Sequence, residues 1–404
     1  RRLLRSGRES RRRRRGRRLL RMTTTAATEL SGSRLRSTVT TLAEDRFTGR
    51  RVGTPGGRAA AAWLAGQLQA IGATVTTDEF PVAVRELYRT PELREADRQL
   101  VHRRDFVEHL VSADLPELRT AELVAADASR LTDRWVLAPD LGVSARATHD
   151  GAAGLLVPRG TDEAGWMPKM IAGPMPGDLP VIAVRTELHE RLVAGQVISA
   201  SMPLRTVEVT GANVHGRLRT ATSGGPDILL TAHFDGVGDD PEQRLPAAAD
   251  NASGVAVVLE AARLLAGTLV DGLAVTVLDA EEAGARGSAH HAPTLRAGTV
   301  VLNIDGAAQL GDAAAVEAGG PAHALLAALD QAGRETGVPL RAGAMASDNR
   351  RYAAAGLAAV GIGMGMPGYQ TPAETPDRVE TDTLISATRL VVATVMGLAN
   401  HSRG

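Results

Sequence analysis

The sequence contains no cysteine, one lysine and few aromatic residues. Without cysteine, the chain can form neither disulfides nor thiolate zinc ligands, and its composition fits an intracellular setting. Aromatic residues make up only 2% of the 404 residues, so alanine, valine and leucine must build the core. So few aromatics also argue against a surface that binds nucleic acid by base stacking. Because Lys169 is the only lysine, almost all positive charge is arginine, a bias expected of a GC-rich genome.

Long hydrophobic runs are also absent, so the sequence predicts no transmembrane helix. No apolar segment follows the basic N-terminus, as a signal peptide would require, and we expect a cytoplasmic protein without membrane partners. Residues 1–21 carry twelve Arg and one Glu in a chain of zero net charge. Such a run is typical of nucleic-acid-binding tails. Because Met22 follows it, we expect a translated leader and no nucleic-acid partner.

The length allows two domains, since single cores seldom grow beyond about 250–300 residues. We predict a disordered leader over residues 1–36 and a catalytic domain built from 37–83 and 211–404. Residues 84–210 are predicted to form an inserted β-rich domain, because short apolar segments such as "RWVLAPD" and "GAAGLLVPR" alternate with turns there.

Strands and helices alternate in the predicted catalytic domain. "DILLTAHFD", "LAVTVLDA" and "GTVVLNID" are continuous apolar runs typical of strands buried on both faces. "SGVAVVLEAARLLAG" predicts a helix that Asn251 or Ser253 can cap and Gly267 can end. Another helix is expected from about Thr381 to Ala399. The predicted fold class is α/β, a three-layer sandwich with a mixed, mostly parallel sheet covered by helices on both faces.

Polar residues gather where these strands end. They are His233 and Asp235, Asp250 before a helix start, the pair Glu281 and Glu282, and Asp305. In α/β sheets the carboxyl ends of the strands line the ligand crevice. The apolar strands need no acids at their tips for folding, so this pattern indicates a functional site.

The segments "HFD", "DNASG", "EEAG", "NID" and "YQTPAE" occur in an order that resembles the co-catalytic zinc exopeptidases of metallopeptidase clan MH. That family includes bacterial leucyl aminopeptidases and glutamate carboxypeptidase. The resemblance covers residues of about 37–83 and 212–400. The insert, with its exit "TGANVHGRL", looks like a protease-associated domain.

The resemblance implies one or two Zn²⁺ ions and a peptide substrate. His233 and Asp305 would bind the first metal, Glu282 would bind the second, and the carboxylate of Asp250 would bridge both. Asp235 would hold the other imidazole nitrogen of His233 and fix its tautomer. Two such cations would activate a water and polarise the scissile carbonyl.

Two further residues would take part in the chemistry. Glu281 would accept a proton from the water and pass it to the leaving amine. Tyr369 could donate a hydrogen bond to the developing oxyanion. The implied activity is that of a metal-dependent exopeptidase, most simply an aminopeptidase.

Gln370 stands where the family has a histidine ligand to the second metal. Its amide offers a neutral oxygen, whereas zinc prefers nitrogen and sulfur, and oxygen-only sites suit harder cations. The second site can therefore bind zinc weakly, hold another divalent metal, or stay empty. We expect a hydrolase with an altered second site, and the alternative is a catalytically decayed binding protein on the same fold.

Simpler interpretations of single residues remain open at this point. His233 alone could be a core histidine, Asp250 could be only a helix N-cap, and the Glu281–Glu282 pair could be a solvated helix start. His290 and His291 are expected at the surface. They or His323 could also approach position 370 and replace the missing ligand.

Overall fold

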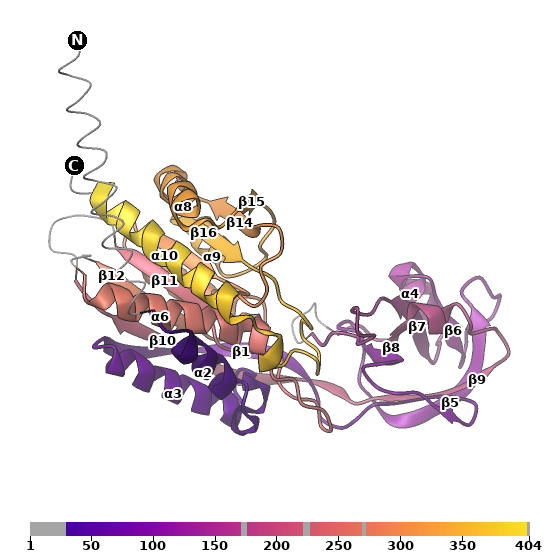
Figure 1. Ribbon diagram of the computed structural model, residues 1–404. Helices are drawn as coiled ribbons and strands as arrows, with labels where there is room; N and C mark the ends of the chain where they lie inside the picture. The colour runs from indigo at the N-terminus through magenta and orange to yellow at the C-terminus, as the bar shows by residue number, and fades with distance from the viewer. Residues whose placement is uncertain (1–29, 171–175, 221–226, 269–271, 402–404) are drawn as a thin grey trace, which may run out of the picture.

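The computed structural model describes residues 30–170, 176–220, 227–268 and 272–401. The described chain forms two bodies, each with its own sheet, joined by a long two-stranded ribbon (Figure 1). Residues 1–29 of the predicted disordered leader, 1–36, lie outside the described residues, but its end is wrong because the helix α2 (Gly32–Leu42) begins within it.

The larger body contains an eight-stranded mixed sheet. Its strands, in spatial order, are β1 (Thr74–Leu87), β10 (Leu204–Arg217), β12 (Leu273–Leu278), β11 (Ile228–His233), β13 (Val300–Ile304), β16 (Ala358–Gly363), β14 (Ala314–Gly319) and β15 (Leu340–Ala342). The four central strands β12, β11, β13 and β16 are parallel, while β10 and β14 join them antiparallel. The prediction of a mixed α/β sheet is confirmed.

Side chains on both faces of this sheet are buried. Leu230 packs into a cluster with the helices α2 (Gly32–Leu42), α3 (Pro55–Ala70), α6 (Ser253–Ala266), α8 (His323–Thr336) and α10 (Thr381–His401). Its neighbour Leu229 packs on the opposite face, with the turn η4 (Ala292–Thr294) and the helix α9 (Asn349–Ala354). The short helix α7 (Arg286–His291) lies beside α9. Burial on both faces explains why these strands read as continuous apolar runs.

The helix α6 begins and ends at the residues that the sequence predicted. The Asn251 side-chain oxygen accepts a hydrogen bond from the Gly254 amide at 2.9 Å, and Gly267 is the C-cap. Asn251 is fully buried, and its side-chain amide donates to the Ile304 carbonyl at 2.8 Å. The cap therefore also fixes the start of α6 against the end of β13.

The C-terminal helix α10 is a core helix of the larger body. Its apolar face is buried and contains Leu384, Ala387, Leu390, Val391, Val395 and Leu398. Among the described helices, α10 has the length and apolar composition to cross a membrane over Thr381–Asn400, but half of that window is buried inside the protein. Its closest packing is against α8 and α6.

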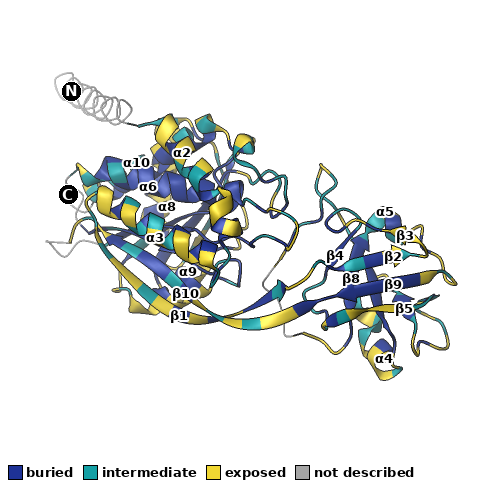
Figure 2. Ribbon diagram, turned by 90° about the horizontal axis from the view of Figure 1, so that it is seen from below, coloured by how far each residue is buried: buried dark blue, intermediate teal, exposed yellow. Residues whose placement is uncertain are grey.

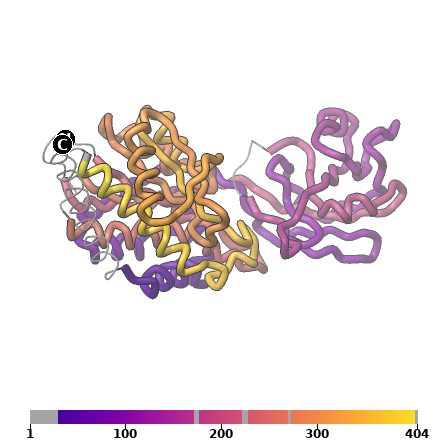
Figure 3. The backbone as a smooth tube through the Cα atoms, turned by 45° about the horizontal axis from the view of Figure 1, so that its top comes forward, coloured from indigo at the N-terminus to yellow at the C-terminus, as the bar shows by residue number. Residues whose placement is uncertain are grey.

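The two bodies are connected through β1 and β10, which pair antiparallel from Thr74–Arg217 to Leu87–Leu204. In Figure 3 this ribbon is the link between the two parts of the chain. The strands continue past positions 84 and 210, where the domain division was predicted. Leu87 and Leu204 already belong to the core of the smaller body.

The smaller body, here called the insert, contains a second eight-stranded sheet. Its strands, in spatial order, are β3 (Arg98–Gln99), β2 (Glu92–Glu95), β9 (Val197–Met202), β5 (Leu115–Ala125), β6 (Trp135–Leu137), β7 (Gly154–Arg159), β8 (Val181–Arg185) and β4 (Phe106–Glu108). The short helices are α4 (Ser144–His149) and α5 (Thr186–His189). Figure 2 shows buried residues along β8 and β9, so the insert has a core of its own.

Candidate metal centre

The predicted site residues converge at one edge of the larger sheet. His233 ends β11, Glu281 and Glu282 follow β12, and Asp305 follows β13, and these three strands are parallel. Their carboxyl ends therefore meet at the same edge. Asp250 joins them from the turn η3 (Ala248–Ala252), which directly precedes α6.

His233, Asp250 and Asp305 form a buried group whose potential ligand atoms all lie within 4.8 Å of one another. The Nε2 atom of His233 lies 3.0 Å from Asp250 Oδ1 and 3.2 Å from Asp305 Oδ1. Burial alone would lower the pKa of His233, but the surrounding carboxylates raise it well above its usual value. One imidazole and two carboxylates facing a common point are the ligands that a divalent cation requires.

Asp235 supports this group through two different interactions. The Nδ1 atom of His233 lies 3.1 Å from the Asp235 backbone oxygen and 3.5 Å from its carboxylate. The Asp235 backbone oxygen, more than its carboxylate, therefore holds the imidazole of His233. Nε2 of His233 faces Asp250 and Asp305. The carboxylate of Asp235 accepts hydrogen bonds from the Glu281 and Glu282 amides at 3.0 and 3.1 Å.

Glu282 and Gln370 meet at the position expected for a second metal. The Gln370 side-chain amide donates a hydrogen bond to Glu282 Oε2 at 2.5 Å. The other oxygen of Glu282 and the side-chain oxygen of Gln370 are buried, and neither has a hydrogen-bond partner among the described residues. Two buried oxygens without a partner fit a bound cation, since unpaired buried oxygens are costly.

None of the other candidate histidines replaces the missing ligand at this point. His290 pairs with Asp78 at 3.3 Å, and His291 lies 3.0 Å from the Tyr352 hydroxyl. The surface prediction is wrong for His291, which is buried because it packs under α9 against Tyr352 and His215. His323 begins α8 and is exposed.

Glu281 lies at the rim of the site, and its side chain makes no hydrogen bond to another described residue. Its pKa is raised well above the usual value by burial and by the neighbouring acids Asp305, Asp348 and Asp250, against the field of His233. A carboxylate held in that way is a stronger base than one in water.

Tyr369 is 43% exposed. Burial of its hydroxyl and the same acidic field raise the pKa of Tyr369, which keeps the phenol protonated and able to donate.

Sequence reasoning missed Glu374, which binds the backbone of two residues of the second site. It is buried, and its carboxylate accepts hydrogen bonds from the Asp250 amide at 2.5 Å and the Gln370 amide at 2.7 Å. Burial raises the pKa of Glu374 well above its usual value, together with the field of Asp250. Its place in the segment "YQTPAE", four residues after Gln370, was the available signal.

A second missed residue is Arg50, a fully buried cation behind the acids. Its guanidinium donates to the backbone carbonyls of Leu42, Phe234, Pro246 and Ala247 at 2.6–2.9 Å. Burial lowers the pKa of Arg50 to about 10, and the carboxylates of the site oppose that shift. Arg50 therefore stays charged at neutral pH and offsets part of the negative charge of the centre. It also fixes both ends of the segment between β11 and η3.

The insert contacts the site through a buried ion network. Arg103 donates to Asp240 Oδ2 at 2.7 Å and to Glu108 Oε1 at 2.6 Å, and the Lys169 ammonium lies 3.0 Å from Asp240 Oδ1. The Lys169 backbone amide donates to the Gln370 carbonyl at 2.9 Å. Burial would raise the pKa of Glu108, but Arg103 lowers it to about 2, so the pair stays ionised. The insert is thereby tied to the loop that carries Gln370.

The fold and the site together have the features of a metallopeptidase, and comparisons with known proteins agree. Residues 213–395 match the family model described as Peptidase family M28. The match confirms the prediction of a metallopeptidase, which acts on peptides. A comparison with curated proteins found no match.

Several solved structures resemble this chain over nine-tenths of its length. The zinc aminopeptidase BSAP from Bacillus subtilis has 22% identity and a TM-score of 0.72, covering 91% of this chain and 94% of that chain. The aminopeptidase from Aneurinibacillus sp. strain AM-1 has 18% identity and a TM-score of 0.68, with coverages of 92% and 94%. A peptidase M28 precursor from Shewanella amazonensis has 18% identity and a TM-score of 0.69, with coverages of 94% and 96%. At these identities the likeness is one of fold, and its coverage includes the insert.

Proposed function

We propose that this protein is a metal-dependent aminopeptidase that hydrolyses the N-terminal peptide bond of its substrates. The main observation in support is the buried group of His233, Asp250 and Asp305, whose potential ligand atoms lie within 4.8 Å of one another. Glu281 follows the neighbouring strand β12. The similar structures from Bacillus subtilis and Aneurinibacillus are named as aminopeptidases, which supports this specificity. When bound, divalent cations lower the pKa of a coordinated water and polarise the scissile carbonyl.

His233 and Asp305 would hold the first cation, and Asp250 would share it with a second one. Zinc suits the first position, because its donors are an imidazole nitrogen and carboxylate oxygens. Glu282 and Gln370 would complete the second position with oxygen atoms alone, which suits a harder cation or weaker zinc binding. Glu374 would fix Asp250 and Gln370 through their backbone amides, and Arg50 would balance the charge of the acids.

Glu281 would act as the general base and then as the general acid. Its carboxylate would take a proton from the attacking water and deliver it to the amine of the leaving group, so the proton count balances. Asp235 would position it by holding the Glu281 and Glu282 amides. Tyr369 would remain protonated and donate a hydrogen bond to the oxygen that gains charge.

The test is release of the N-terminal residue from an aminoacyl anilide such as alanyl p-nitroanilide. We expect hydrolysis that a chelator abolishes and that added zinc restores. Hydrolysis that resists exhaustive chelation would contradict the proposal, as would cleavage of N-acetylated substrates at the same rate.

The second candidate is a binding protein on the same fold with a decayed site. The hydrogen bond from Gln370 to Glu282 favours it, because that contact occupies the place of an imidazole ligand. Metal analysis separates the two functions. No bound metal after purification in added zinc, together with no hydrolysis, would support the binding protein. A cytoplasmic location and a protease-associated identity of the insert stay predictions.

A further inference from the structure

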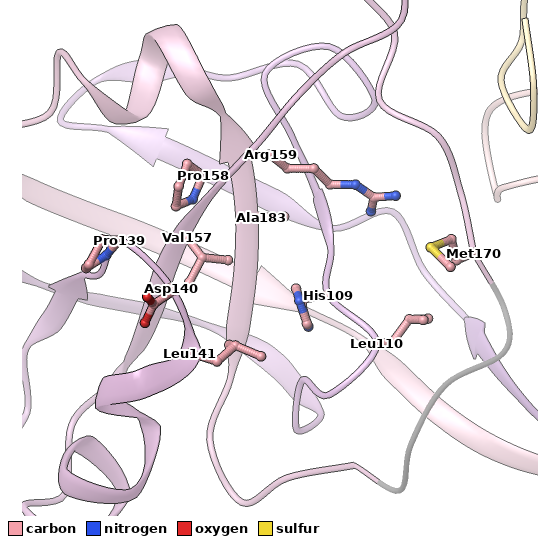
Figure 4. Close-up of a pocket in the computed structure, with 10 residues that line it drawn as sticks. All are labelled: His109, Leu110, Pro139, Asp140, Leu141, Val157, Pro158, Arg159, Met170 and Ala183. Atoms are coloured by element: carbon pink, nitrogen blue, oxygen red, sulfur yellow. The ribbon is translucent and has the colours of Figure 1, made fainter.

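The insert contains a cavity that the proposed chemistry does not use. Its volume is about 440 Å³, and it lies at the carboxyl ends of β6 and β7 (Figure 4). Its walls are mainly apolar and include Leu110, Leu141, Val157 and Met170. Its cationic side chain is Arg159, the last residue of β7.

The Arg159 guanidinium has no ion pair or hydrogen bond with another described residue. It is only partly buried, and the residue lines the cavity. The neighbouring cations Arg103 and Lys169 are already neutralised by Glu108 and Asp240. Arg159 therefore has no bonded anion among the described residues, and a partly buried guanidinium gains from a ligand that supplies one.

Other polar groups of the cavity leave room for an anion. His109 also lines it, and burial together with the charge of Arg159 lowers the pKa of His109, so its imidazole is neutral at neutral pH. Asp140 is the acid in the lining, but Figure 4 shows it well apart from the Arg159 guanidinium. The Asp140 carboxylate is exposed and accepts a hydrogen bond from the Gly142 amide at 2.7 Å.

The cavity borders the candidate metal centre. Met170 lines it, and the preceding residue, Lys169, donates its backbone amide to the Gln370 carbonyl at 2.9 Å. The cavity is thus next to the loop that carries Tyr369 and Gln370.

We propose that Arg159 binds a carboxylate of the peptide substrate and makes the enzyme selective for short or acidic peptides. This inference rests on the proposed aminopeptidase function and adds the substrate class. The planar guanidinium matches a carboxylate with two parallel hydrogen bonds. The apolar walls would accommodate the side chain next to that carboxylate. The carboxylate can be the C-terminal group of a dipeptide or an acidic side chain, and separate substrates distinguish the two.

The experiment compares matched substrates with and without a carboxylate. Alanyl-alanine is compared with alanyl-alanine amide for the C-terminal group, and glutamyl with alanyl p-nitroanilide for the acidic side chain. In one of these pairs we expect Arg159→Gln to lower kcat/KM of the carboxylate substrate by about 10- to 100-fold, mainly through KM, since charged hydrogen bonds are of that strength. Hydrolysis of alanyl p-nitroanilide should be unchanged. Arg159→Lys should restore part of the loss, because lysine keeps the charge but not the fork.

The matched control is Arg130→Gln, which removes an exposed arginine of the insert away from the cavity. The proposal is overturned if the parent enzyme prefers the carboxylate substrate in neither pair, or if Arg159→Gln changes all substrates equally. Binding gives a readout that does not need turnover. The Glu281→Gln variant should bind the preferred carboxylate peptide at least about 10-fold more tightly than its uncharged partner, and the additional Arg159→Gln change should abolish that difference.

The two proposals fail in different ways. Hydrolysis of alanyl p-nitroanilide without any carboxylate preference would leave the aminopeptidase standing and remove the role of Arg159. No hydrolysis of any substrate, with Arg159-dependent binding of the carboxylate peptide, would remove the aminopeptidase and leave the carboxylate site.

Discussion

The backbone amide of Lys169 in the insert donates a hydrogen bond to the carbonyl oxygen of Gln370, the residue at the altered ligand position. The ammonium of the same lysine donates to the carbonyls of Gly238 and Asp239 and pairs with Asp240. One residue of the insert therefore holds two loops of the catalytic body. We expect changes in this contact region to alter activity as well as stability.

Replacement of Asp240 with asparagine tests that coupling. The variant Asp240→Asn leaves Arg103 and Lys169 buried without their shared anion, and breaking one partner of such a network costs about 3–5 kcal/mol. We expect a loss of that size in the free energy of unfolding measured in urea, together with a lower kcat. Asp312→Asn, at an exposed acid, is the matched control. Equal stability of the two variants would contradict the structural role of the network.

Glu281→Gln should remove the proton acceptor without removing a metal ligand. We expect kcat to fall by about 10²–10⁴-fold, the usual contribution of general acid–base catalysis. Metal content per chain, measured by elemental analysis, should stay at the parent level. The exposed Glu242→Gln serves as the control. Normal turnover in Glu281→Gln would refute the assignment of the base.

Gln370→His should restore an imidazole at the second position. Gln370 has a positive φ of 54°, a conformation that histidine tolerates better than most residues. We expect zinc content to rise from about one to about two ions per chain, since imidazole is a better zinc ligand than an amide oxygen. The rate on alanyl p-nitroanilide should rise with it. The control is Gln331→His on the exposed face of α8. Unchanged metal content in Gln370→His would show that position 370 does not limit the second site.

Glu260 should make stability depend on pH between about 4.5 and 2. Burial would raise its pKa, but hydrogen bonds from Arg263, Arg34 and the Ser31 amide lower the pKa of Glu260 from 4.5 to about 2. A lowered folded-state pKa means that the stabilisation is complete above pH 4.5 and is lost as the pH falls through 2.

The measurement is urea unfolding of the parent and Glu260→Gln from pH 7 to pH 3. At pH 7 we expect the variant to be less stable by about 1–2 kcal/mol, less than the full pKa shift implies because water screens the half-exposed Arg34. The difference should shrink below pH 4. A difference that is constant with pH would indicate lost packing in place of lost charge.

Local patterns in the sequence were sufficient to predict the helices and strands that carry the site. The helix α6 with its Asn251 cap, the apolar strands β11 to β13, and the buried face of α10 all follow from residue periodicity and capping chemistry. The convergence of His233 and Asp305 follows from the same source, because parallel strands bring their carboxyl ends to one edge, and Asp250 joins them from the start of α6.

The tertiary structure alone decided the contacts between residues far apart in the chain. The segment "YQTPAE" contains Glu374 but does not show that its carboxylate binds two site amides, and no local pattern marks Arg50 as a buried cation or His291 as a core residue. The backbone hydrogen bond between Lys169 and Gln370 depends on how the insert packs against the catalytic body. The same packing leaves the Arg159 guanidinium without an ion pair among the described residues. Periodicity indicates which face of a helix or strand is buried. Which residue bonds to which depends on where the folded chain brings complementary charges and hydrogen-bonding groups together.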